Sequence, residues 1–501
     1  MSGLIFLEKN TEFHFLPLRR IQSKLHFTHF FGLLVILFFC FVSNDTVSAE
    51  TAANLKPTIT LSTGEDSTAL NDVNYASSFE FKAQTTITLQ AASPIYGVYL
   101  YWDRPSSGWT LQSGNSVVTY GQYEMLHEYV KVDHPSNTVT ITIPDNGAIL
   151  CEIQAFGYGD LPSDIQTWLP PCEQADILLF PTHAGDESLV FGGTIPYYAG
   201  EMGRNVQVAY LVKHYPDESY REHEKLNALW AMGLRNYPVM GTFEDTFTSG
   251  HVTDSARYDY DAVLEYVVTQ IRRFKPLVVL GHDLNGEYGH GLHVVGAKAV
   301  SQSMNFSKDS TYNIASVDQY GVWEQDKTYL HSYKVNSIHM NWNIALTKFN
   351  GKTALQLADE GFKLNDSQQW TGFQVSDTGL YNCADFGLYL SSVGPDKKGG
   401  DFMENITPYA ERINANSNAN ESTSASEPSS TVSSESSAPT DSATSQSTSV
   451  SESTETSTSG RLQSFEQSYL EIEPLALKVG GICIVLVAIG SFISLFIKKK
   501  N

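Results

Sequence analysis

The sequence predicts an α/β protein in which a β-sandwich domain precedes an open parallel sheet with helices on both faces. Nearly continuous apolar runs at residues 175–180, 206–212 and 276–280 are typical of parallel strands covered on both sides. The segments between these runs, 218–234 and 258–274, carry apolar residues at helical spacing. Because strand and helix alternate, the strands are expected to form one parallel sheet between two layers of helices.

The stretch before this pattern, residues 55–160, predicts an antiparallel sandwich. Short alternating segments such as 58–61 and 138–143 are separated by turn residues, as is usual for such domains. Segments 97–102 and 151–157 resemble the strands of discoidin-like jelly rolls. The resemblance implies a jelly-roll-like β-sandwich.

Composition excludes one class of partner. The 501-residue chain has a formal net charge of -23 and a pI near 4.9. Binding to a phosphate backbone requires clustered Lys and Arg, so we expect no nucleic acid partner.

The two ends of the chain predict export and attachment to the cell membrane. Residues 1–49 have the basic, apolar and small-residue regions of a secretory signal peptide, with an uncleaved anchor as the alternative. Residues 478–497 are apolar and long enough for a transmembrane helix, and lysines in 498–501 predict a cytoplasmic tail. The Ser/Thr-rich segment 411–465 predicts a disordered stalk. The expected localisation is single-pass, with the ectodomain extracellular.

Two loops of the second domain hold a candidate metal site. His183 and Asp186 follow the first predicted strand, and His293 lies in the segment after the third. In open parallel sheets, ligands bind beyond the carboxyl ends of the strands. Two imidazoles and one carboxylate are a ligand set of hydrolytic zinc, with one position left open for water. Other divalent metals accept the same donors.

Both loops resemble the motifs of the PIG-L/LmbE-like zinc-dependent de-N-acetylases. Residues 181–187 are similar to the first motif of that family, and residues 289–293 are similar to the Gly-His-x-x-His that ends the second. The resemblance spans about 175–408 and implies a Rossmann-like deacetylase domain at 173–410. It also implies that the zinc ligands are the same three residues named above.

The resemblance implies two further roles. His290 is the histidine that would support the tetrahedral oxyanion or protonate the leaving amine, and Arg221 is the arginine that would contact substrate. The implied substrate is an N-acetylated sugar or glycan. The implied activity is removal of acetyl groups from N-acetylated amino sugars of a cell-surface glycan or glycolipid.

One departure from the family pattern concerns the general base. The aspartate that takes a proton from the zinc-bound water in relatives falls on Gly185, which has no side chain to accept it. A substitute base is expected from Asp283, Glu187 or Glu287. Alternatively, Asp283 and Glu287 accept hydrogen bonds from loop backbone or from the ligand imidazoles.

The missing carboxylate leaves other functions open. One alternative is a catalytically impaired carbohydrate-binding protein of the cell surface. Another is a purely structural adhesin, which predicts no stoichiometric metal. Without a base, a zinc-bound hydroxide is expected to react about 10²–10⁴-fold more slowly.

Overall fold

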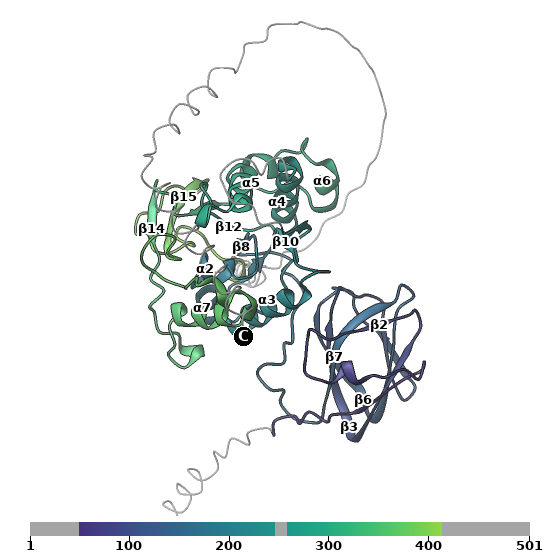
Figure 1. Ribbon diagram of the computed structural model, residues 1–501. Helices are drawn as coiled ribbons and strands as arrows, with labels where there is room; N and C mark the ends of the chain where they lie inside the picture. Colours follow the sequence, from purple (N-terminus) through teal and green to yellow (C-terminus); the bar gives the residue numbers. More distant parts are fainter. Residues whose placement is uncertain (1–49, 246–257, 413–501) are drawn as a thin grey trace, which may run out of the picture.

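The computed structural model describes residues 50–245 and 258–412, which form a β-sandwich and an α/β domain (Figure 1). The predicted signal peptide, transmembrane helix and cytoplasmic tail lie outside these residues, as does the predicted stalk beyond residue 412. Among the helices in the described residues, none has the length and apolarity needed to cross a membrane.

The first domain is the predicted antiparallel β-sandwich. Its strands are β1 (Thr58–Leu61), β2 (Phe79–Phe81), β3 (Thr86–Trp102), β4 (Thr110–Ser113), β5 (Ser116–Thr119), β6 (His127–Thr142) and β7 (Ala148–Phe156). They pair antiparallel in the order β2-β7-β3-β6-β4-β5, and β1 pairs with β3. The register of β3 on β6 shifts between Gln90 and Gly97, and such irregularities let a long hairpin bend. Buried Trp102 and Trp109 fill the core.

The second domain is built on a six-stranded sheet of order β14-β15-β13-β12-β8-β9. Four strands are parallel, namely β8 (Ile177–Leu179), β9 (Val206–Val208), β12 (Val278–Gly281) and β13 (Lys327–His331). At one edge, β15 (Asp385–Ser391) pairs antiparallel with both β13 and β14 (Ser337–His339). The predicted open parallel sheet is therefore confirmed, and β15 adds an antiparallel edge that the sequence did not predict. An antiparallel edge needs only one covered face, and the end of β15 is half-exposed.

Helices cover both faces of this sheet, as predicted (Figure 1). Leu178 of β8 shares an apolar cluster with Val267 and Val295, whereas Leu179 shares another with Leu226 and Leu357. These partners lie on α4 (Tyr260–Phe274), α5 (Gly291–Ser307), α3 (Ser219–Ala231) and α7 (Ala354–Lys363). The remaining short elements are α2 (Asp186–Leu189), α6 (Ile314–Tyr320), and the strand pair β10 (Val212–Lys213) and β11 (Phe243–Glu244).

The sandwich contacts helix α3 through a buried polar seam. His127 of β6 and His223 of α3 are both fully buried, and their Nε2 and Nδ1 atoms lie 2.7 Å apart. The hydroxyl of Tyr99 lies 3.1 Å from the other nitrogen of His127. The backbone N–H of Leu126 donates to the hydroxyl of Tyr237 at 2.8 Å. These contacts join the two domains next to the helix that carries Arg221.

Acidification is expected to weaken this seam. Burial lowers the pKa of both histidines, that of His223 to about 4 from its usual 6.5. Between these values the unfolded chain binds a proton that the folded chain does not. The contribution of the neutral histidines to the free energy of unfolding is therefore fully present above about pH 6.5. It is lost as the pH falls toward 4, and for His223 the loss is on the order of 3 kcal/mol. Urea unfolding midpoints at pH 7 and pH 5 measure the loss. A His223→Gln variant should show a shallower pH dependence, and equal slopes would contradict this account.

Candidate metal centre

The first loop of the site places His183 and Asp186 at the carboxyl end of β8. Asp186 begins α2, and its Oδ2 atom accepts hydrogen bonds from the backbone N–H groups of Thr182 at 3.0 Å and His183 at 2.7 Å. These bonds hold the carboxylate against its own loop. Gly185 precedes the helix with a φ of 101°, a left-handed conformation that favours glycine.

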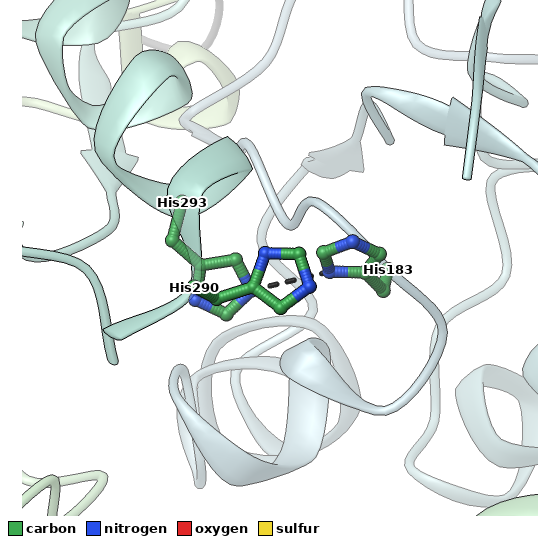
Figure 2. A group of neighbouring side chains, drawn as sticks. All are labelled: His183, His290 and His293. Carbon is green, nitrogen blue, oxygen red and sulfur yellow. Dashed lines mark hydrogen bonds between the residues drawn. The ribbon is translucent and has the colours of Figure 1, made fainter. Parts of the chain in front are cut away.

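The second loop follows β12, the neighbour of β8 in the sheet. It contains Glu287 and leads into α5, whose first turn carries His293. Because the two strands are parallel and adjacent, both loops leave the same edge of the sheet. Figure 2 shows His183 facing His293 and His290 across the gap between the two loops.

Three atoms of these side chains are spaced as ligands of one ion. His183 Nδ1 lies 3.1 Å from His293 Nε2 and 3.4 Å from Asp186 Oδ2, and His293 Nε2 lies 3.3 Å from the same oxygen. Tetrahedral zinc with bonds of 2.0–2.1 Å requires about 3.3 Å between donor atoms. The donor set and its spacing therefore fit a zinc ion.

The described residues contain two overlapping groups able to hold a metal ion. One consists of His183, His290 and His293, and the other of Asp186, His282 and His293. Of the three ligands predicted from the sequence, His183 belongs to the first group, Asp186 to the second and His293 to both. His282 Nε2 lies 3.6 Å from Asp186 Oδ2, so it borders the candidate site.

Glu287 is the acidic centre of the second loop. Its buried carboxylate lies 2.8 Å from Nδ1 of His293, 2.9 Å from Nδ1 of His282 and 2.6 Å from Nδ1 of His331. Burial acts to raise the pKa of Glu287, but the three histidines hold it well below its usual range. By accepting from Nδ1 of His293, the carboxylate leaves Nε2 free to bind a metal.

Neutralising Glu287 is expected to weaken metal binding. In Glu287→Gln, the amide keeps the shape but loses the charge that fixes the ring of His293. Metal affinity should fall about 10–100-fold, the usual effect of losing a partner of a ligand. Competition with a chelator measures the affinity. Glu360→Gln, a change at an exposed ion pair with Lys352, is the matched control and should leave the affinity unchanged.

The carboxylate of Asp245 lies beside the imidazole of His183. Oδ1 of Asp245 lies 3.4 Å from Nε2 of His183, while its Oδ2 lies 2.8 Å from Arg221 and 3.5 Å from Nδ1 of His214. Although burial opposes the change, His183, His214 and Arg221 hold the pKa of Asp245 well below its usual range. Each predicted imidazole ligand thus has a carboxylate at the nitrogen that faces away from the site.

Sequence reasoning missed Asp245 and His282. A signal for both was their position, because Asp245 directly follows β11 and His282 directly follows β12. Polar residues just beyond the carboxyl ends of strands are candidates in such folds. Neither residue lies within 181–187 or 289–293, the segments to which roles were assigned, so neither was singled out.

The remaining predicted residues differ in their placement. The ring of His290 lies 4.3 Å from that of His183 and 4.8 Å from that of His293, and burial lowers the pKa of His290 to about 2. Arg221 reaches the site through Asp245. Asp283 accepts hydrogen bonds from Asn285 at 2.9 and 3.2 Å. Within residues 50–245 and 258–412, no hydrogen bond joins its carboxylate to the predicted ligands, and its role stays a prediction.

The class of the second domain follows from comparison with known proteins. Residues 178–304 match the family described as GlcNAc-PI de-N-acetylase, PIG-L. The chain therefore contains a PIG-L/LmbE deacetylase domain, as its motifs indicate.

Particular relatives match over part of their length. A 1D-myo-inositol 2-acetamido-2-deoxy-alpha-D-glucopyranoside deacetylase of Geodermatophilus obscurus is 26% identical over 178 residues. The match covers 30% of this chain and 60% of that relative, so the chain spans less than two thirds of its length.

Solved structures are similar to each domain. N,N'-diacetylchitobiose deacetylase from Pyrococcus horikoshii covers 48% of this chain and 91% of its own, at 16% identity and a TM-score of 0.32. A pectin binding carbohydrate binding module covers 22% of this chain and 96% of its own, at 13% identity and a TM-score of 0.17.

Proposed function

We propose that the α/β domain is a zinc-dependent hydrolase that removes acetyl groups from N-acetylated amino sugars of a cell-surface glycan or glycolipid. The observation that carries this proposal is the spacing of three donor atoms at 3.1, 3.3 and 3.4 Å. The PIG-L match supports the reaction class. Zinc is the ion we favour, although other divalent metals accept these donors.

The side chains around the donor atoms suit this chemistry. His183, Asp186 and His293 would hold the ion, which supplies an acidified water and polarises the acetyl carbonyl. His290, beside both ligand rings, would donate a hydrogen bond from its neutral imidazole to the tetrahedral oxyanion. Arg221 would contact the sugar.

The general base is the weak point of the proposed reaction. The carboxylate of Glu187 accepts from the backbone of Gly185 at 2.8 Å and from a tyrosine at 3.0 Å. Glu287 is occupied by three histidines, Asp283 by its own turn, and Asp245 by Arg221. Each carboxylate is thus engaged through at least one oxygen, whereas Oε1 of Glu187 accepts no hydrogen bond from the described residues. We infer hydrolysis by a hydroxide formed without strong base assistance, about 10²–10⁴-fold slower than with it.

The alternative is a catalytically impaired carbohydrate-binding protein of the cell surface. It is favoured by Gly185, where a side chain would be strained by the φ of 101° and its Cβ would lie 3.3 Å from Phe362. The loop is therefore fitted to glycine. In this alternative the chain binds sugar, with or without the metal, but releases no acetate.

Zinc content and acetate release separate these functions. The full chain, dialysed against zinc, should hold one ion and release acetate from N-acetylglucosamine slowly, at a rate proportional to bound zinc. Bound zinc and sugar without acetate release would favour the impaired binding protein. Absence of stoichiometric metal would overturn the hydrolase, and absence of both metal and sugar binding would leave the structural adhesin.

We further propose, from the sequence of the two ends, that the chain is anchored in the cell membrane with both domains outside. Accessibility of the sandwich to a protease added to intact cells tests this arrangement. Protection from the protease until the cells are lysed would contradict it.

A further inference from the structure

We propose that Tyr288, Phe373 and Tyr381 form a subsite for a second sugar ring of an oligosaccharide, next to the candidate metal centre. We call these three residues the aromatic rim. The inference rests on the proposed function, which it deepens by naming an oligosaccharide as the substrate class.

The three rings of the aromatic rim are in contact. The ring of Tyr288 lies 4.3 Å from that of Phe373, with an angle of 31° between their planes, and 4.8 Å from that of Tyr381. Tyr288 is 38% exposed and Phe373 is 39% exposed. Tyr381 is half-buried beside them. Single exposed apolar residues are common on proteins, whereas rings that contact one another at the surface are candidates for a binding surface.

The aromatic rim is attached to the metal centre by a buried bridge. His331 joins the carboxylate of Glu287 at 2.6 Å to the backbone carbonyl of Asn382 at 2.7 Å. Tyr288 directly follows Glu287, and Tyr381 directly precedes Asn382. Because Glu287 also contacts His293, the rim is fixed relative to a predicted metal ligand.

Tyr288 connects the aromatic rim to the metal centre along the chain. Burial, followed by the carboxylates of Glu287 and Asp186, raises the pKa of Tyr288 to about 12. Tyr288 directly follows Glu287, whose carboxylate lies 2.8 Å from Nδ1 of the predicted ligand His293, and its ring contacts the two other rings of the aromatic rim. A sugar bound at the metal centre would have its neighbour in the chain over the rim.

Backbone conformation at the rim is strained. Tyr288 has a φ of 57° and Tyr381 a φ of 60°, both in the left-handed region that bulky residues rarely adopt. Both conformations are unfavourable for tyrosine, and such strain gathers at functional sites. Glycine would relieve this strain, so the two tyrosines are present at a cost to the stability of the folded chain.

The chemistry of the rim fits a pyranose better than a lipid chain. Flat aromatic faces pack against the C–H faces of sugar rings, and few polar groups then fix the orientation. Burial, followed by the half-buried carboxylate of Asp283, raises the pKa of Tyr381. A carboxylate at the edge of the rings accepts hydrogen bonds from hydroxyl groups, whereas burying it under an acyl chain is costly.

Calorimetric titration of the zinc-loaded full chain tests the subsite. The probes are N-acetylglucosamine, its β-1,4-linked trimer and the octyl glycoside of N-acetylglucosamine. The trimer should bind roughly tenfold or more tightly than the monomer, as expected for ring packing. Phe373→Ala should reduce this preference to less than about threefold, and Phe373→Tyr should retain it. Ile314→Ala, at a 61% exposed position on α6, is the control and should keep the native preference.

Three results would overturn the subsite. The first is equal binding of monomer and trimer, which includes the case that neither binds. The second is an equal loss of monomer affinity and trimer affinity in Phe373→Ala, and the third is tightest binding of the octyl glycoside. Acetate release is scored separately. A preference for the trimer without deacetylation would support the subsite and reject the proposed hydrolase. Deacetylation without a preference for the trimer would reject the subsite alone.

Discussion

Replacing His293 with alanine is expected to abolish stoichiometric zinc binding. His293 contributes one of the three donor atoms, and its Nε2 lies 3.1 Å from His183 Nδ1 and 3.3 Å from Asp186 Oδ2. Loss of a direct ligand should lower the affinity by more than the roughly 100-fold that accompanies loss of a ligand's partner. Zinc content after dialysis at fixed free zinc, measured by atomic emission, gives the result.

The matched control changes a histidine outside the site. The side chain of His339, on β14, is 60% exposed and pairs with Asp385. His339→Ala should keep the native zinc content. If His293→Ala also kept native content and affinity, the assignment of the ligands would be wrong.

The second large effect concerns Gly185. Gly185→Asp should release acetate about 10²–10⁴-fold faster than Gly185→Ala, because only the aspartate offers a carboxylate to take a proton from the attacking water. Both variants carry the same Cβ, which meets the same φ of 101° and the same 3.3 Å approach to Phe362. Comparing them therefore isolates the carboxylate from the backbone strain.

Stability measurements complete this comparison. Both variants should unfold at lower denaturant concentration than the native chain, with a loss on the order of 1–3 kcal/mol for a strained backbone. Equal acetate release by the two variants would mean that a carboxylate at this position does not act as a base here. Glycine would then be a feature of the loop and not the cause of slow hydrolysis.

Much of the architecture could be predicted from the sequence because it follows from local patterns. The apolar run at 175–180 became β8 and the loop after it, and the helical spacing at 258–274 became α4. The run at 206–212 became two strands, β9 and β10, in separate sheets. The antiparallel direction of β15 was not predicted, because strand direction depends on a long connection that no short pattern encodes.

The part of the site that lies in the two motifs could be predicted from the sequence. His183, Asp186 and His293 follow strands that are neighbours in the sheet, and the structure brings them together. Asp245 was missed because it comes to His183 from a different strand pair, β10 and β11, which pattern reasoning did not predict. The sequence left two roles open for Glu287, a substitute base or an acceptor of hydrogen bonds from the ligand imidazoles. The structure places its carboxylate within hydrogen-bond distance of the imidazole of His293.

The most direct test of the metal centre is a crystal structure of the zinc-loaded chain, with the ion located by anomalous scattering at the zinc edge. We predict one ion bound by His183 Nδ1, His293 Nε2 and Asp186 Oδ2, with water completing the tetrahedron. An ion held by His183, His290 and His293 without Asp186, or no ion between the two loops, would contradict this prediction.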